Sequence, residues 1–96
     1  MTDEPYDLVV TSTALRALSA APPRGVGERV AWVVYEFVQG PLLVAPHRVG
    51  KPLGGPLAGT FSARRGSFRI LYEVDDATRT VTVTAVQHRS EVYRPR

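Results

Sequence analysis

Apolar and polar residues alternate along four stretches of the chain, one near its start and three in its last third. Such alternation is typical of half-buried strands, and it occurs at 6–10, 59–65, 68–74 and 81–87. The dipeptide Gly66-Ser67 separates two of these stretches, and a two-residue loop with glycine first is the signature of a type II′ turn. The sequence therefore predicts a small, mainly antiparallel sheet of four strands.

Between the first two of these stretches the spacing of apolar residues becomes helical. On one face of a helix over 26–39 would lie Val26, Val30, Val33, Val34, Phe37 and Val38. A shorter helix is expected over 14–20, before the prolines at 22 and 23. The Gly- and Pro-rich residues 40–57 should form an ordered connector, since apolar residues recur in it. We therefore expect an α+β fold, with the N-terminal strand and a two-helix hairpin packed on one face of the sheet, in a single domain over 1–96.

The turn at 66–67 fixes the register of the first hairpin and places Arg64 directly opposite Arg69. One face of the sheet should be apolar and covered by the helices, and it holds Phe61, Ala63, Phe68, Ile70, Tyr72, Val74, Val81, Val83 and Ala85. The other face is polar and carries Thr60, Ser62, Arg64, Arg69, Glu73, Thr82, Thr84 and, by the same alternation, His88. Nothing in the predicted fold is left to cover that polar face.

The positive charge of the chain is concentrated in its C-terminal part. Residues 1–57 hold five basic and five acidic residues, whereas residues 58–96 hold seven arginines and four acids, which accounts for the net charge of +3. A one-sided basic surface attracts polyanions, nucleic acid above all. The alternative is a solvated charged face that serves solubility.

Composition excludes several kinds of site. The chain has no cysteine, which excludes disulfides and thiolate metal ligands, and its two histidines are too few for a convincing zinc site. We therefore expect no metal and no cofactor. The acidic N-terminus lacks the pattern of a signal peptide, and the longest apolar stretch, at 31–38, is too short to span a membrane. The expectation is a cytoplasmic protein without membrane contact.

Arg64 and Arg69 are the strongest candidates for a functional site. Like charges directly opposite each other on neighbouring strands are destabilising. A phosphate group bound between the two arginines would convert that repulsion into two charge-assisted contacts. The alternative is that Glu73 or another acid neutralises one of them.

Two side chains near the end of the chain are candidates for proton transfer. Histidine is the natural general acid or base at neutral pH, but His88 can equally be an ordinary surface residue at the end of a strand. The Tyr93 hydroxyl is suited to acid–base chemistry and its ring to stacking on a base. Alternatively, Tyr93 packs the C-terminal tail onto the sheet. His47, in the connector, is expected to be structural.

Three stretches of the sequence carry a family resemblance. They are GKPLGGPLAG at 50–59, RRGSFRILYEV at 64–74 and HRSEVYR at 88–94. Together they resemble the RelE branch of the RelE/ParE toxin superfamily, over nearly the whole chain and with the same order of strands and helices. The resemblance implies the toxin of a toxin–antitoxin pair. It also implies a ribosome-dependent mRNA endonuclease that uses the 2′-hydroxyl of the RNA as its nucleophile and so inhibits translation and growth.

By matching positions, the resemblance implies roles for individual residues. The expected catalytic residues are Arg64, Arg69, His88 and Tyr93. The arginines would hold and neutralise the scissile phosphate, and the histidine or the tyrosine would transfer protons. Further contacts to RNA are expected from Lys51, Arg65, Arg89 and Arg94. The best-known members carry lysines on the first strand of the hairpin, where this chain has Thr60 and Ser62, so the identity of the general base stays open.

The resemblance also implies partners. A basic open face fits an acidic, RelB-like antitoxin that folds on contact and masks the site. Toxin and antitoxin would form a hetero-oligomer that binds operator DNA through the antitoxin, and the ribosome with its mRNA would be the target. The competing interpretation is a ParE-like toxin that binds and poisons DNA gyrase and cuts no RNA. The missing lysines favour that interpretation, whereas the closing motif from His88 to Tyr93 favours the ribonuclease, which we prefer.

Overall fold

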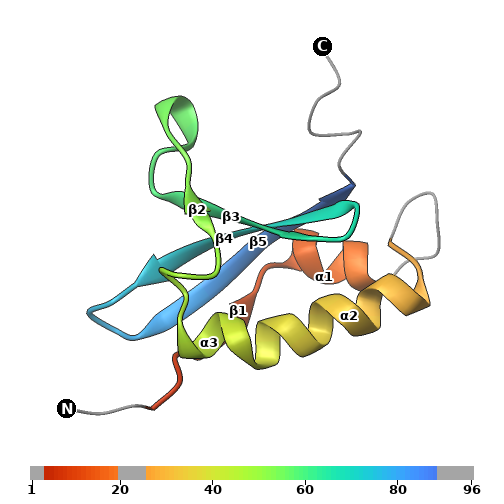
Figure 1. Ribbon diagram of the computed structural model, residues 1–96, viewed down its shortest axis with the longest axis horizontal. Coiled ribbons are helices and arrows are strands. Elements are labelled where there is room, and N and C mark those ends of the chain that lie inside the picture. The colour runs from red at the N-terminus through yellow and green to blue at the C-terminus, as the bar shows by residue number, and fades with distance from the viewer. Residues whose placement is uncertain (1–3, 20–25, 89–96) are drawn as a thin grey trace.

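The strands form one mixed sheet in the spatial order β1-β5-β4-β3-β2, and the helices cover one of its faces (Figure 1). The computed structural model describes residues 4–19 and 26–88. Within them the elements are β1 Asp7–Val10, α1 Ser12–Ser19, α2 Glu28–Gln39, α3 Pro41–Val44, β2 Lys51–Pro52, the 3₁₀ helix η1 Gly55–Leu57, β3 Thr60–Arg65, β4 Phe68–Asp75 and β5 Thr80–His88. β1 pairs with β5 in parallel, and the other neighbouring strands are antiparallel. The predicted α+β class and the mainly antiparallel sheet are confirmed.

The sheet has one strand more than the four that the sequence predicts. β2 consists of Lys51 and Pro52 of the connector, which pair with Ser62 and Phe61 at the edge of β3. A strand of two residues is too short to show an alternating pattern. Proline cannot donate a hydrogen bond to a neighbouring strand, and it is therefore found at the edge of a sheet, as Pro52 is here. The connector therefore forms part of the sheet, although its composition gives no sign of a strand.

The first residues of the two longer helices are set by the residues just before them. α1 starts earlier than predicted because Thr11 caps it, with the amide of Ala14 donating to the Thr11 hydroxyl oxygen at 3.2 Å. α2 starts later than predicted, after Gly27, whose φ of 86° lies outside the helical range. None of the helices in the described residues is long and apolar enough to cross a membrane.

The core lies between the helices and the predicted apolar face of the sheet. Its buried residues on the helices include Val34, Phe37 and Val38 of α2, whereas Val33, which the helical pattern placed on the same face, is 48% exposed. The buried residues contributed by the sheet are Ala63, Ile70, Tyr72, Val81, Val83 and Val86. Five of these six were predicted from alternation, and Val86 was not.

A β-bulge in β5 explains why Val86 is buried in place of Ala85. The register shifts between Leu71, which faces Ala85, and Tyr72, which faces Val83, so Thr84 is an extra residue on β5. Val86 then lies opposite the buried Ile70. The prediction that Ala85 belongs to the core face is therefore wrong.

The bulge also overturns the alternation argument for His88. Counting every second residue from Thr82 and Thr84 placed His88 on the same face of the sheet as Arg69. The backbone register instead pairs His88 with Phe68, and Gln87 with Arg69. That prediction is wrong because it counted straight through the bulge. The side chain of His88 lies outside what the structure describes.

The β3–β4 hairpin has the predicted turn and the predicted register. Gly66 has a φ of 61°, as the first position of a type II′ turn requires, and Ser67 is not among the described residues with positive φ. Arg64 pairs with Arg69, and Arg65 pairs with Phe68. The pairing of the two arginines across the hairpin is thus confirmed.

The connector is held against the sheet by a buried tyrosine. The hydroxyl of Tyr72 on β4 donates to the carbonyl oxygen of Pro46 at 2.6 Å, and burial raises the pKa of Tyr72 to about 12. A Cβ on Gly50 would lie 2.3 Å from that hydroxyl oxygen and 3.0 Å from the carbonyl oxygen of Ser62. Only glycine fits there, and its small size lets the next residue, Lys51, reach the edge of the sheet.

Candidate functional site

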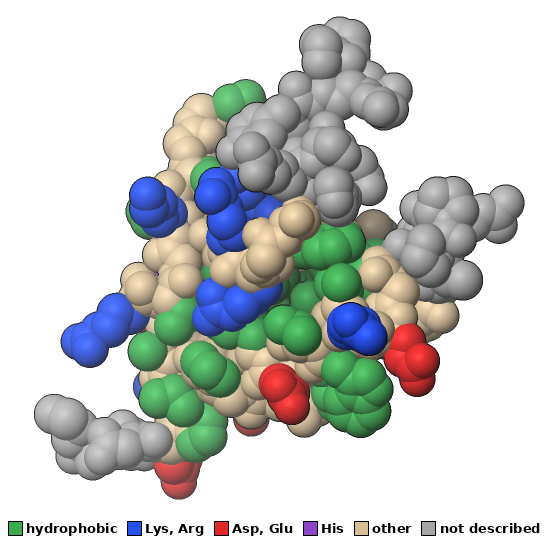
Figure 2. Space-filling model, turned by 45° about the vertical axis from the view of Figure 1, so that its right-hand side comes forward, with side chains coloured by type: hydrophobic (Ala, Val, Ile, Leu, Met, Phe, Trp, Pro, Cys, Tyr) green, Lys and Arg blue, Asp and Glu red, His purple; other side chains and the backbone are tan. Residues whose placement is uncertain are grey.

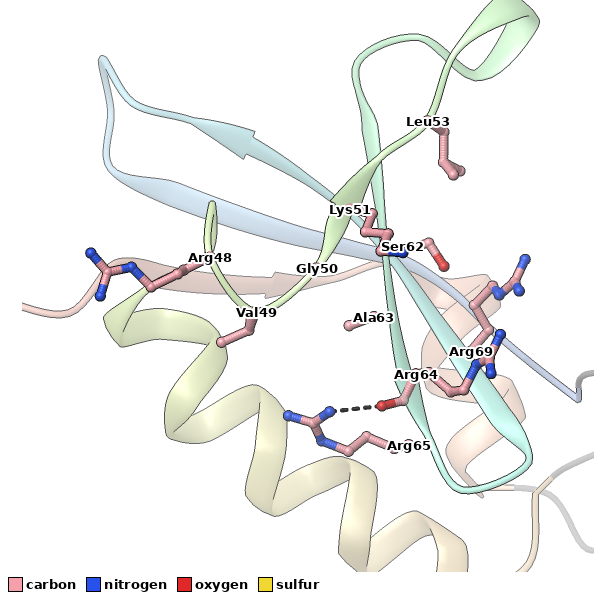
Figure 3. A pocket seen from close by; sticks show the side chains of 10 residues that line it. All are labelled: Arg48, Val49, Gly50, Lys51, Leu53, Ser62, Ala63, Arg64, Arg65 and Arg69. Atoms are coloured by element: carbon pink, nitrogen blue, oxygen red, sulfur yellow. Dashed lines mark hydrogen bonds between the residues drawn. The ribbon is translucent and has the colours of Figure 1, made fainter.

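A cleft of about 550 Å³ opens between the connector and the β3–β4 hairpin (Figure 3). It is lined by Arg48, Val49, Gly50, Lys51, Leu53, Ser62, Ala63, Arg64, Arg65 and Arg69. Half of these ten residues carry a positive charge, and none of the described residues that line the cleft is acidic. Figure 2 shows most of the Lys and Arg side chains of that view at its left and centre, and one more at lower right beside acidic side chains. The cleft therefore suits an anionic ligand.

Three cations lie close together on one side of β3. Arg64 and Arg69 face each other across the hairpin, and Lys51 pairs with Ser62, two residues before Arg64. In Figure 3 the side chains of Arg64 and Arg69 project from the same side of the hairpin, next to Ser62 and Lys51. The sequence placed Lys51 in the connector without showing whether it reaches this site. Because β2 forms, it does.

No acid of the described structure neutralises the paired arginines by a salt bridge. Glu73 lies on the same face of the sheet, but its partners across the strands are Thr60 and Thr82. Within the described residues, the ion pair found joins His47 to Asp76, at 2.9 Å. The alternative in which Glu73 pairs with Arg64 or Arg69 is therefore not realised in this structure.

Arg65 behaves differently from its two neighbours. Its guanidinium carbon lies 3.8 Å from the centre of the Phe37 ring of α2, which is a cation–π contact. One guanidinium N–H donates to the carbonyl oxygen of Arg64 at 2.7 Å (Figure 3). Arg65, predicted to contact RNA, thus has its charged group directed at the helix layer.

Comparison with known proteins identifies the family. Residues 11–93 match the family described as the ParE toxin of type II toxin–antitoxin systems, parDE. The chain is 49% identical over 90 residues to toxin RelG of Mycobacterium tuberculosis, which covers 94% of this chain and 98% of the relative. The chain belongs to the RelE/ParE family of toxins. It is also 45% identical over 92 residues to toxin RelE of the same organism, covering 96% of this chain and 90% of that toxin.

A solved structure supports the same assignment. The toxin–antitoxin complex RelBE2 of Mycobacterium tuberculosis contains a chain that superimposes on this toxin with a TM-score of 0.78 at 49% sequence identity, covering 90% of this chain and 100% of that one. The resemblance to the RelE branch that the sequence motifs indicated is therefore confirmed.

Four of the expected site residues cannot be placed. Tyr93, Arg89 and Arg94 lie outside the described residues of the toxin, and of His88 only the backbone is described, paired with Phe68. The expected residues that the structure does bring together are Lys51, Arg64, Arg65 and Arg69. Sequence analysis missed Arg48, which also lines the cleft. Its only signal was its position in the sequence, shortly before the resembling stretch at 50–59.

A second cluster of charged groups lies at the far end of β4 from the cleft. The Nε2 atom of His47 lies 2.9 and 3.0 Å from the two carboxylate oxygens of Asp76, and the Tyr6 hydroxyl donates to the same carboxylate at 2.5 Å. The guanidinium of Arg79 lies 4.3 Å from the centre of the Tyr6 ring. The hydrogen bond from Tyr6, and then that from His47, holds the pKa of Asp76 below its ordinary value. These contacts tie together the N-terminal strand, the connector and the β4–β5 turn, which fits the structural role expected for His47.

No group of three or more metal-ligating side chains exists among the described residues of the toxin. The cleft offers five nitrogen cations and the hydroxyl of Ser62, all of which can donate hydrogen bonds to phosphate oxygens. Its chemistry is that of an anion site.

Proposed function

We propose that this toxin cleaves mRNA on the ribosome and so arrests translation and growth. The observation that supports the proposal is the pairing of Arg64 with Arg69 across the hairpin, with Lys51 beside them in a cleft whose described lining holds no acid. A structural role gives no reason to keep like charges opposite each other. A phosphate group that gains negative charge during reaction gives one.

The chemistry that fits this cleft is an internal transesterification. The 2′-hydroxyl of the nucleotide before the cut attacks the neighbouring phosphorus atom and loses its proton to a base. The bond from phosphorus to the 5′ oxygen of the next nucleotide breaks, and that oxygen receives a proton, leaving a cyclic phosphate and a 5′-hydroxyl. Arg64 and Arg69 hydrogen-bond the non-bridging oxygens and stabilise the extra charge of the five-coordinate phosphorus. No metal or cofactor is needed for these steps.

The remaining residues take supporting roles in this proposal. His88 or Tyr93 transfers protons, as the family motif implies, and Lys51 is the third cation beside the phosphate. Arg89 and Arg94 contact the flanking RNA. Lys51 pairs with Ser62 across β2 and β3, so it brings a positive charge next to a position where the best-known members carry a hairpin lysine.

An acidic antitoxin is the proposed partner. The related toxin chain of RelBE2 was solved in a toxin–antitoxin complex. An acidic, RelB-like chain that covers the cleft would neutralise the cations and block access of RNA. We propose that the hetero-oligomer forms in the cytoplasm, where ribosomes work, and that it contacts operator DNA through the antitoxin.

The gyrase-poisoning alternative is less favoured. Both curated relatives, at 49% and 45% identity, carry RelG and RelE names.

The test is cleavage of mRNA on programmed ribosomes by the purified toxin. We expect cleavage by the unmodified chain, and a loss of about 10²-fold or more for Arg64→Ala and for Arg69→Ala, the usual cost of removing one electrostatic stabiliser. Arg29→Ala, which removes an exposed charge from α2, is the matched control and should cleave normally. If the unmodified toxin leaves ribosome-bound mRNA intact but inhibits supercoiling by purified gyrase, the proposal fails and the gyrase alternative stands.

A further inference from the structure

The carbonyl group of Arg64 lies on an edge of the sheet that has no strand beside it. In a hairpin with a two-residue turn, the residues that flank the turn form the hydrogen-bonded pair, which here is Arg65 with Phe68. The next pair, Arg64 with Arg69, is the non-hydrogen-bonded kind, so the Arg64 peptide groups point away from β4. The neighbour on that side, β2, pairs only with Phe61 and Ser62 and ends before it reaches Arg64.

Arg65 fills the place of the missing strand. Its guanidinium donates to the Arg64 carbonyl oxygen at 2.7 Å, on the side of the gap between connector and hairpin (Figure 3). The same guanidinium lies 3.8 Å from the centre of the Phe37 ring, and Phe37 is only 3% exposed. One cation thus bridges the core of the helix layer and the backbone of the residue that faces Arg69.

We propose that Arg65 is a positioning residue, which fixes the backbone of Arg64 so that its side chain is aimed at the phosphate, and which makes no phosphate contact of its own. This inference rests on the proposed function of the cleft. Arg64 is the penultimate residue of β3 and adjoins the turn, where strand ends are least constrained by pairing. An anchored carbonyl removes that freedom before the substrate arrives, which is how a preorganised site lowers the barrier.

Two measurements separate a positioning role from a phosphate contact. The first is single-turnover cleavage on programmed ribosomes, expressed per folded molecule. The second is the affinity for a single-stranded RNA oligonucleotide that carries a 2′-deoxy nucleotide at the cleavage position, measured over a range of salt concentrations. Each phosphate contact to a single strand contributes about 0.7 to the slope of log affinity against log salt.

For Arg65→Met we expect cleavage to slow by roughly ten- to hundredfold, the scale of a small misplacement. The affinity for the oligonucleotide and its salt slope should match the unmodified toxin. Arg64→Met should lower the slope by about 0.7. Arg65→Lys keeps a donor and a charge and should restore part of the rate. Arg29→Met, on the exposed side of α2, should change neither quantity.

Phe37→Leu provides the matched test of the anchor, because it leaves the charge of Arg65 in place and removes the ring beneath it. It should slow cleavage to a similar extent, and combining it with Arg65→Met should add little. The same pair should show coupled effects on thermal unfolding, which tests the contact without any cleavage assay.

Other outcomes would overturn the inference in distinguishable ways. If Arg65→Met lowers the salt slope as much as Arg64→Met does, Arg65 contacts phosphate and the positioning role is wrong. If Arg65→Met cleaves normally while Arg64→Ala does not, the positioning role is wrong and the proposed function stands. If all these variants, including Arg64→Ala, cleave like the unmodified chain, the cleft is not the cleavage site and the positioning role is wrong. If the unmodified chain itself leaves ribosome-bound mRNA intact, the proposed function is wrong.

Discussion

The charged side chains at the two ends of β4 have opposite surroundings. At its start, Arg69 faces Arg64, and like charges meet across a hairpin. At its end, the carboxylate of Asp76 is engaged by His47 and by the Tyr6 hydroxyl. The contacts of Asp76 join three segments of the chain and contribute to stability, whereas two like charges facing each other across the hairpin favour the binding of an anion. The difference suggests that β4 has a functional end, where Arg69 faces Arg64, and a structural end, where Asp76 is held by His47 and Tyr6.

The largest expected effect comes from breaking the functional end. Arg64→Ala should lower mRNA cleavage by about 10²-fold or more, while the free energy of unfolding stays the same or rises by about 0.2–1 kcal/mol, because a cross-strand repulsion is relieved. Thermal unfolding measured beside cleavage on programmed ribosomes gives both quantities. An Arg64→Ala protein that melts early yet cleaves normally per folded molecule would assign Arg64 to the structural side of the comparison.

The next effect concerns the middle of the strand, where Tyr72 holds the connector. Gly50→Ala should destabilise the toxin by roughly 1–3 kcal/mol, the usual cost of overpacking, because the new Cβ would lie 2.3 Å from the Tyr72 hydroxyl oxygen. Denaturant unfolding measures this loss. Adding Tyr72→Phe removes the clashing oxygen, so the double variant should lose less stability than the sum of the two single losses. Strict additivity would mean that the clash with Tyr72 is not the cause.

A pH-dependent loss of stability is expected at the structural end. The pKa of Asp76 is lowered in the folded toxin, so its ionised form is favoured by folding. The contribution is therefore fully present above the ordinary carboxyl pKa of about 4 and disappears as pH falls through the lower folded value. Asp76→Asn should have a lower melting temperature than the unmodified chain at neutral pH, and the two should converge in acid.

Cleavage gives the control for this variant. Asp76→Asn should cut mRNA normally per folded molecule, because the cleft lies at the other end of β4. A gap in melting temperature that stays constant down to strong acid would contradict the role assigned to the Asp76 carboxylate.

The smallest expected effect comes from removing one hydrogen bond at the structural end. Tyr6→Phe keeps the ring beneath Arg79 and removes the hydroxyl that donates to Asp76. Since that bond is the main cause of the lowered pKa, the pKa of Asp76 should move back toward its ordinary value. An NMR titration of the Asp76 carboxyl carbon measures the shift. An unchanged titration would mean that His47 alone holds the carboxylate.

Local patterns in the sequence were enough to predict the centre of the fold. Alternation and a glycine-first turn determined the β3–β4 register, including the facing of Arg64 and Arg69, because both signals act between near neighbours. The burial of Tyr72 and Ile70 followed from the same alternation.

Other features depend on contacts that no local pattern records. β2 forms because Gly50 fits beneath Tyr72, a residue far along the chain, and the pattern around Lys51 carries no trace of that contact. The bulge at Thr84 adds one residue to β5, so the alternation of the sequence no longer follows the faces of the sheet beyond it. Counting by alternation therefore assigned His88 to a face that the backbone register does not support. The faces of residues on the central hairpin could be predicted from alternation, and the pairing of His88 beyond the bulge could not.

The bulge has a further consequence, for the order in which the chain folds. The hydroxyl of Thr11 donates to the carbonyl oxygen of Thr84 at 3.2 Å while accepting from the Ala14 amide, so the cap of α1 is anchored on the irregular point of β5. That contact joins residues 73 positions apart, whereas the β3–β4 hairpin closes over a two-residue turn. Because closing a long loop costs more entropy than closing a short one, we expect the meander of β3, β4 and β5 to form first. The first helix encoded by the chain would then be among the last elements to dock, and a kinetic experiment should find α1 unformed when the hairpins are already protected.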